Sequence, residues 1–170
     1  MAPYASDILH TSDRASLDIL LILNGMGIPG RIIPALLADR VFGPMNMLIP
    51  TALLSGLLLL CWIAIHSYGG LIGFLVVLGY FAAGVQSLFP STLSSLTTDL
   101  RKMGTRVGMV FTVYGLATLT GPPIGGALIT AYGGGYLHAQ LFAGLCLCCG
   151  SALLVVARQV KVRGALVKKV

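Results

Sequence analysis

The chain has 170 residues, of which 56% are hydrophobic and only 9% are charged, and its mean hydropathy is +0.93. In ordinary soluble domains about one-quarter of the residues are charged, so this composition excludes a soluble globular protein. All five acidic residues are aspartates, and eleven lysines and arginines outweigh them. These bases lie between apolar runs rather than on a basic face with stacking aromatic residues, which argues against nucleic-acid binding.

Two long stretches, 41–98 and 107–157, contain no charged residue. One bilayer crossing takes roughly 20 apolar residues, so each stretch has room for two of them. No stretch alternates apolar and polar residues as a strand of a membrane β-barrel does. Backbone inside lipid must satisfy its own hydrogen bonds, which a helix achieves within one segment. We therefore expect an all-α, polytopic helical membrane protein. In chain order, its five transmembrane helices are predicted at about 16–38, 45–66, 71–89, 107–131 and 137–157.

The basic residues predict how these helices are oriented. Five spans place the two ends of the chain on opposite sides of the membrane. With the C-terminus in the cytoplasm, the inner segments hold nine bases and the outer segments hold only Arg14, as the positive-inside rule favours. We therefore expect a polar external segment at 1–15, a helix bundle at 16–158 and a basic cytoplasmic tail at 159–170. The nine inner bases are Arg40, Arg101, Lys102, Arg106, Arg158, Lys161, Arg163, Lys168 and Lys169.

The first predicted span is the least lipid-like of the five, because it carries Arg31 near its middle. A charge at membrane depth is costly, and it usually faces the bundle interior or an aqueous cavity. Asn24, Arg31 and Ala35 recur at helical spacing on one face. Arg31 is therefore the first candidate for substrate binding, and Asn24 is a second. Alternatively, Arg31 snorkels to the cytoplasmic interface as an anchor, and Asn24 makes only an interhelical hydrogen bond.

The later spans carry weaker candidates. Gln86, Ser87 and Tyr114 are polar residues that can line a cavity, although packing hydrogen bonds explain each of them better. The four cysteines lie inside apolar runs without metal-ligand spacing and are interpreted as small hydrophobic residues. No nucleophile motif or metalloprotease motif occurs in the sequence. We therefore expect no metal, no cofactor and no enzymatic activity.

The segment from Gly30 to Asn46 reads GRIIPALLADRVFGPMN. An aspartate and an arginine at a helix end can pair with each other or with a neighbouring helix end. The segment resembles the loop between spans eight and nine of the major facilitator superfamily, in its fungal monocarboxylate-transporter-like branch. The resemblance implies that Asp39, Arg40 and Gly43 form the gating signature of that loop. This sequence departs from the signature in having alanine at position 35, where the signature has glycine, and in placing Gly43 one residue later.

The fourth predicted span reads TLTGPPIGGALIT, with Gly121, Pro122, Gly125 and Gly126 closely spaced. Small residues four apart let helices approach closely, and proline bends a span. This segment resembles the glycine-proline element of span eleven in the same superfamily. The resemblance covers 16–158 and aligns the five helices with spans eight to twelve of a twelve-span transporter, so that spans one to seven are missing.

The resemblance implies transmembrane transport of a small organic solute, with a monocarboxylate as one candidate. In characterised monocarboxylate members, an arginine of span eight lies in the central cavity, four residues after an aspartate. Arg31 matches that arginine, but Gly27 occupies the acid position, so proton coupling by such a pair is not expected. The implied location is an integral, multi-pass one, in the plasma membrane.

The expected partners are the lipid bilayer, a small-molecule substrate, and either the missing N-terminal half or a full-length transporter. We expect no transport by these helices alone, because an alternating-access cavity lies between two halves. The alternative function is that of a non-transporting membrane interaction subunit, or a truncated paralogue, that associates with a full-length transporter.

Overall fold

In the computed structural model, the chain folds almost entirely into helices. The structure describes residues 13–65, 67–97 and 100–162. No strand occurs among these residues, so the expected all-α class is confirmed. The elements are α2 (Asp13–Leu37), the π-helical turn η1 (Ala38–Phe42), α3 (Pro44–Cys61), the 3₁₀ turn η2 (Trp62–Ala64), α4 (Tyr68–Leu96), α5 (Leu100–Ala131) and α6 (Leu137–Val162).

All five long helices have the length and apolar composition needed to cross a membrane. The chain is therefore an integral, multi-pass membrane protein. Helix α4 extends well beyond the expected 71–89, and α5 begins at Leu100 rather than at 107. Hydropathy marks only the apolar part of a helix, whereas the backbone hydrogen bonds continue into the polar residues at its ends. Of the expected terminal segments, residues 1–12 and 163–170 lie outside the described residues.

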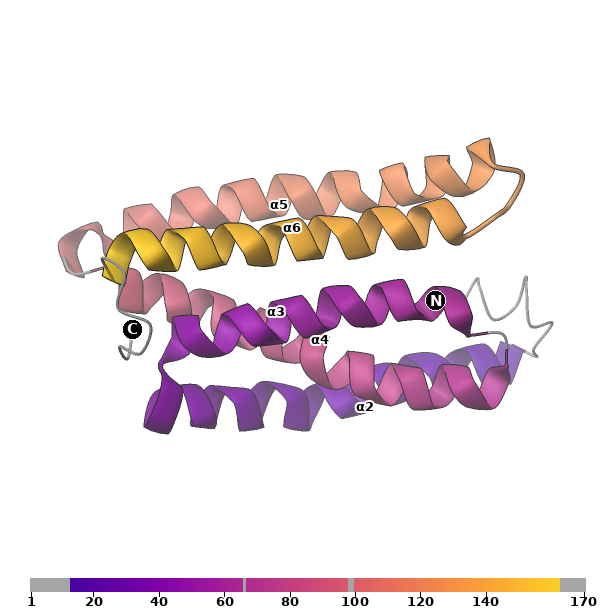
Figure 1. Cartoon of the computed structure of the whole chain (residues 1–170), viewed down its shortest axis with the longest axis horizontal. Helices are drawn as coiled ribbons and strands as arrows, with labels where there is room; N and C mark the ends of the chain where they lie inside the picture. The colour runs from indigo at the N-terminus through magenta and orange to yellow at the C-terminus, as the bar shows by residue number, and fades with distance from the viewer. Residues whose placement is uncertain (1–12, 66, 98–99, 163–170) are drawn as a thin grey trace.

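The helices run side by side along one common axis (Figure 1). Helix α4 packs against both α2 and α3, and α3 also packs against α6. Helices α2 and α3 follow each other in the chain, yet they touch very little, because α4 takes the place between them. Helix α5 lies at the edge of the bundle, in contact with α6 and α4, and none of its most apolar stretch is buried.

Glycines bring α2 and α4 into close contact. A methyl group on Gly30 would lie 2.4 Å from the carbonyl oxygen of Tyr80, and one on Gly79 would lie 3.0 Å from that of Leu23. At Gly84 the nearest atom would be the carbonyl oxygen of Gly30, at 3.2 Å. Side chains at these positions would push the helix backbones apart. Small residues therefore set the distance between these helices, as they do at many contacts inside membranes.

Small residues also join α3 to α6. A methyl group on Gly56 would lie 2.9 Å from the sulfur of Cys148, and one on Gly144 would meet the Leu60 side chain at 2.6 Å. The buried hydroxyl group of Ser55 donates to the Thr51 carbonyl oxygen of its own helix at 2.8 Å. A hydroxyl group satisfied by its own helix adds no unpaired polar group to the interface.

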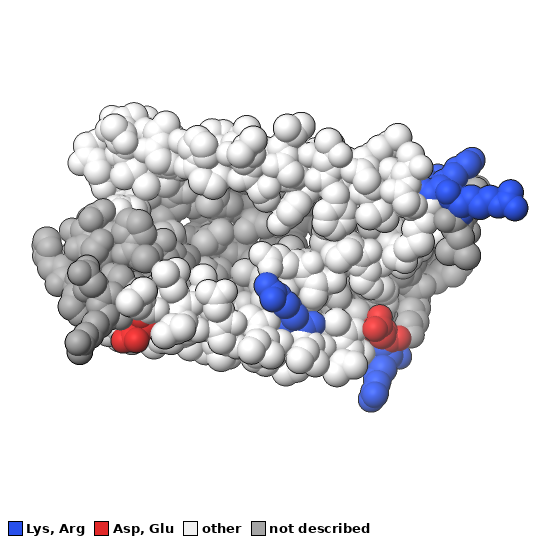
Figure 2. Space-filling view, turned by 180° about the vertical axis from the view of Figure 1, so that it is seen from behind, with Lys and Arg blue, Asp and Glu red and all other residues white. Residues whose placement is uncertain are grey.

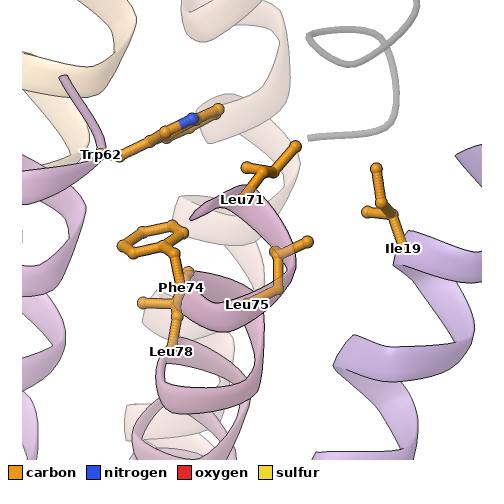
Figure 3. Packing of buried hydrophobic residues seen from close by; sticks show 6 residues of the cluster. All are labelled: Ile19, Trp62, Leu71, Phe74, Leu75 and Leu78. Carbon is orange, nitrogen blue, oxygen red and sulfur yellow. The ribbon is translucent and has the colours of Figure 1, made fainter. Parts of the chain in front are cut away.

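A hydrophobic cluster joins α2, η2 and α4 at one end of the bundle (Figure 3). The ring of Trp62 stacks on Phe74 with centroids 6.4 Å apart. Ile19 of α2 faces the α4 residues from the other side, and Leu75 is fully buried between them. Burial of such side chains contributes about 1.5–3 kcal/mol each where the alternative is water. This cluster holds the start of α4 against α2 and against the turn η2 that follows α3.

The charged residues gather mainly at the other end, where α2, α4 and α6 end and α3 and α5 begin. Figure 2 shows basic side chains at that end and an isolated basic group midway along the molecule. At the basic end, Nε of Arg158, on α6, donates to Oδ1 of Asn46, on α3. Arg158 is only 9% exposed, and its contact with Asn46 ties α6 to the start of α3.

Candidate functional site

Arg31 lies on α2 and reaches across to α4. Its guanidinium Nη2 donates to Oε1 of Gln86 at 3.1 Å. The next residue of α4 adds a second link, because the Ser87 hydroxyl donates to the backbone oxygen of Arg31 at 3.2 Å and to that of Gly84 at 3.1 Å. A charged group and an amide are thus held together in the middle of two membrane-spanning helices.

A small cavity of about 130 Å³ opens at this position. Arg31 and Asn24 both line it from α2, and Gln86 lines it from α4. Asn24 turns its amide nitrogen back to the Leu20 carbonyl oxygen, 2.8 Å away. The structure therefore brings the two predicted binding residues to one cavity.

Gly27 lies in the wall of this cavity, one turn before Arg31. A methyl group there would meet only the Cβ atom of Ala83, at an ordinary contact distance of 3.7 Å. The position thus has room for a small side chain, yet it carries none. The wall beside the guanidinium consequently offers no carboxylate at this point.

Gln86 is the hydrogen-bond partner of Arg31, and the sequence alone did not identify this pairing. It stands 55 residues after Arg31, and its position in an apolar span favoured a packing hydrogen bond over a cavity-lining role. Only the contact between α2 and α4 brings the two together. The available signal was that a lone charge in a span needs a polar partner on a neighbouring helix.

An aromatic cluster, Phe89, Phe111 and Tyr114, lies next to Gln86. The ring centroids are 6.0 Å apart for Phe89 and Phe111, 5.7 Å for Phe89 and Tyr114, and 6.2 Å for the last pair. These distances are typical of attractive aromatic contacts. The cluster connects α4 to α5, and cavities of about 350 and 380 Å³ lie beside it.

The signature loop lies away from the cavity. Asp39 and Arg40 are exposed in the turn η1, and Asp39 follows Arg31 by eight residues, about 12 Å along a helix axis. The late position of Gly43 has a structural reason: its N–H donates to the Ala38 carbonyl oxygen at 2.8 Å, which closes a π turn with one extra residue. Gly43 has a φ of 87°, a conformation that favours glycine.

The predicted packing glycines of α5 face open space among the residues that the structure describes. Methyl groups on Gly121, Gly125 or Gly126 would meet nothing within 4 Å. Pro122, beside them, is exposed. The contacts that rely on glycine are instead those between α2 and α4 and between α3 and α6. Elsewhere in the described part of the chain, no three histidine, cysteine or aspartate side chains gather as a metal site.

Replacing Gly125 with alanine is expected to leave the stability of this chain unchanged or to raise it by up to about 1 kcal/mol, because alanine favours a helix and has open space here. Unfolding of the purified chain by SDS in mixed micelles measures the effect. A clear loss of stability would reveal a packing partner for this face within the chain.

Five membrane-spanning helices with a cationic cavity between two of them define a polytopic membrane protein with a polar site at membrane depth. The family model of the Major Facilitator Superfamily matches residues 1–169. The chain therefore belongs to the Major Facilitator Superfamily.

Several fungal proteins are similar to the chain. An MFS-type transporter of Gibberella zeae is 44% identical over 160 residues, which are 93% of this chain and 36% of the relative. The agnestins efflux protein AgnL12 of Paecilomyces divaricatus is 37% identical over 86% of the chain and 33% of its own length. The aspyridones efflux protein apdF of Emericella nidulans is 32% identical over 86% and 30%. The chain thus spans about a third of these relatives, and no solved structure matches it.

Proposed function

We propose that these helices form part of a secondary transporter that moves a small organic anion across the membrane. The observation that carries the proposal is the pair of Arg31 and Gln86, held over a cavity in the middle of two spans. A guanidinium keeps its charge at any physiological pH and engages a carboxylate through two parallel hydrogen bonds. Gln86 orients it, and Asn24 supplies a further polar group on the wall. A monocarboxylate is the simplest ligand of this kind.

Export is the direction that we propose, since two of the similar proteins are named as efflux proteins. The basic end of the bundle faces the cytoplasm on this proposal, and the N-terminal side lies outside, in agreement with the positive-inside rule. The plasma membrane is the proposed location. Asp39 and Arg40 then lie at the cytoplasmic end, where they stabilise one state of the gate.

Replacing Arg31 with leucine is expected to lower anion export at least tenfold, because a charged hydrogen-bonding group is lost from the site (about 1.5–3 kcal/mol). The assay uses vesicles with these helices fused behind the first two thirds of the Gibberella zeae relative, and a panel of labelled organic acids. Insertion should be normal. Arg106→Leu, which removes an exposed base outside the cavity, is the matched control.

Export by the Arg31 variant at the unaltered rate would overturn the site assignment. The chain by itself, without the fused half, is expected to show no saturable transport, because it supplies only one wall of an alternating-access cavity.

A second candidate function is that of an interaction subunit. The observation that favours it is α5, whose most apolar stretch is unburied and whose glycines Gly121, Gly125 and Gly126 leave space for another helix. Recovery of the chain with a full-length transporter from native membranes, together with no export by the fused form, would favour this function over transport.

A further inference from the structure

The polar cavity at Arg31 does not stand alone. Gln86 lines it and also lines the neighbouring cavity of about 350 Å³, which lies between α4 and α5. The walls of this second cavity are mostly apolar, with Phe89, Phe111 and Tyr114 among them. Gln86 therefore belongs to the walls of both a polar pocket and an aromatic pocket.

Phe89 is the common wall of the apolar region. It lines the cavity shared with Gln86, the one of about 380 Å³ along α5, and a third of about 390 Å³ toward α6. Its ring also contacts both Phe111 and Tyr114. The apolar cavity that shares Gln86 with the cationic pocket is thus the larger of the two, at about 350 Å³ against 130 Å³.

We propose that this aromatic cluster is a second subsite, so that the ligand is an organic acid with a large aromatic or otherwise planar apolar body rather than a short monocarboxylate. The acid group lies at Arg31 and Gln86, and the body lies against Phe89, Phe111 and Tyr114. This inference rests on the proposed function and specifies its substrate class.

Size and charge both favour this class of ligand. Small-molecule sites usually enclose about 300–1,000 Å³ and combine apolar walls with a few polar groups. The two cavities that share Gln86 have this size and lining when they are taken together, whereas the Arg31 pocket alone does not. Among the residues that the structure describes, none that lines either cavity is acidic, so an anion is preferred to a cation. Aromatic rings 5.7–6.2 Å apart offer faces and edges on which a planar body can stack.

The test is saturation binding of radiolabelled 2-naphthoate to the full 170-residue chain in nanodiscs, with acetate and neutral 2-naphthalenemethanol as competitors. Phe89→Ala is expected to weaken naphthoate binding about tenfold and to leave the inhibition constant of acetate unchanged. Tyr114→Ala, a second variant, truncates a residue that is 44% exposed and should lower naphthoate binding in the same way at little cost to folding. Phe81→Ala is the matched control, since Phe81 is an α4 aromatic residue that contacts Tyr80 and lines none of these cavities.

Each outcome separates the subsite from the function on which it rests. Unchanged naphthoate binding by both Phe89→Ala and Tyr114→Ala, with binding lost in Arg31→Leu, would overturn the aromatic subsite and leave the anion site in place. Naphthoate binding that survives Arg31→Leu would instead overturn the proposed anion site. A wild-type chain that binds no naphthoate, after subtraction of empty nanodiscs, would also overturn the subsite, because Phe89, Phe111 and Tyr114, the three rings that form it, all belong to this chain.

Discussion

Replacing Gly30 with alanine is expected to destabilise the packing of α2 on α4 by about 1–3 kcal/mol or more, the usual cost of overpacking a tight contact. The added methyl group would lie 2.4 Å from the carbonyl oxygen of Tyr80 and 2.8 Å from its Cα atom. These are backbone atoms of a helix, so they cannot turn aside as a flexible side chain does. Relief requires the backbones of the two helices to move apart at this contact.

The fluorescence of Trp62 measures this effect, because Trp62 is the one tryptophan of the chain and is buried against Phe74. Its emission can be followed while SDS is titrated into mixed micelles. Gly25→Ala is the matched control on the same helix, since a methyl group there meets nothing within 4 Å. We expect this control to be neutral or slightly stabilising. Equal unfolding midpoints for the two variants would show that α2 and α4 are not in the close contact described.

Separation of α2 from α4 should also weaken the contact between Arg31 and Gln86. Gly30 precedes Arg31, and the contact between Arg31 and Gln86 spans the same two helices. Gly30→Ala is therefore expected to reduce anion binding together with stability, whereas Gly25→Ala should retain both. Normal anion binding by a clearly destabilised Gly30 variant would separate the site from this interface.

Replacing Asn46 with leucine is expected to destabilise the chain by about 1.5–3 kcal/mol, the usual contribution of a hydrogen bond to a charged group. Arg158 donates to the Asn46 side chain and is only 9% exposed, so the substitution removes an acceptor from a buried cation. The Asn46 amide nitrogen also donates to the Phe42 carbonyl oxygen at 2.8 Å. The contact therefore connects η1, α3 and α6 at the basic end.

A double-mutant cycle with Arg158→Met isolates the contribution of this pair. Once Arg158 is gone, the loss of the Asn46 acceptor should matter less, so the double variant should be more stable than the two single losses added together predict. Additive losses in SDS titration would show that the two side chains do not act as a pair.

The sequence by itself determined the class of this protein and much of its outline. Scarce charge and two uncharged stretches predict spanning helices, because lipid accepts few charges and requires the backbone to bond within itself. The segment from Gly30 to Asn46 identified the superfamily, to which the family model assigns the chain. Arg31 stood out because a cation inside an apolar span is rare. Each of these signals is local and can be read without knowing which helices touch.

Only the tertiary structure decided which helices are neighbours. Apolar helices all favour lipid alike, so hydropathy does not distinguish a pairing of α2 with α3 from one of α2 with α4. The choice depends on the fit of surfaces, above all at Gly30 and Gly79, where the backbones come closest. That fit brings Gln86 to Arg31 and the aromatic cluster to Gln86. Within the described ranges, the same fit leaves open space beside Gly121, Gly125 and Gly126, although their spacing is typical of a packing motif.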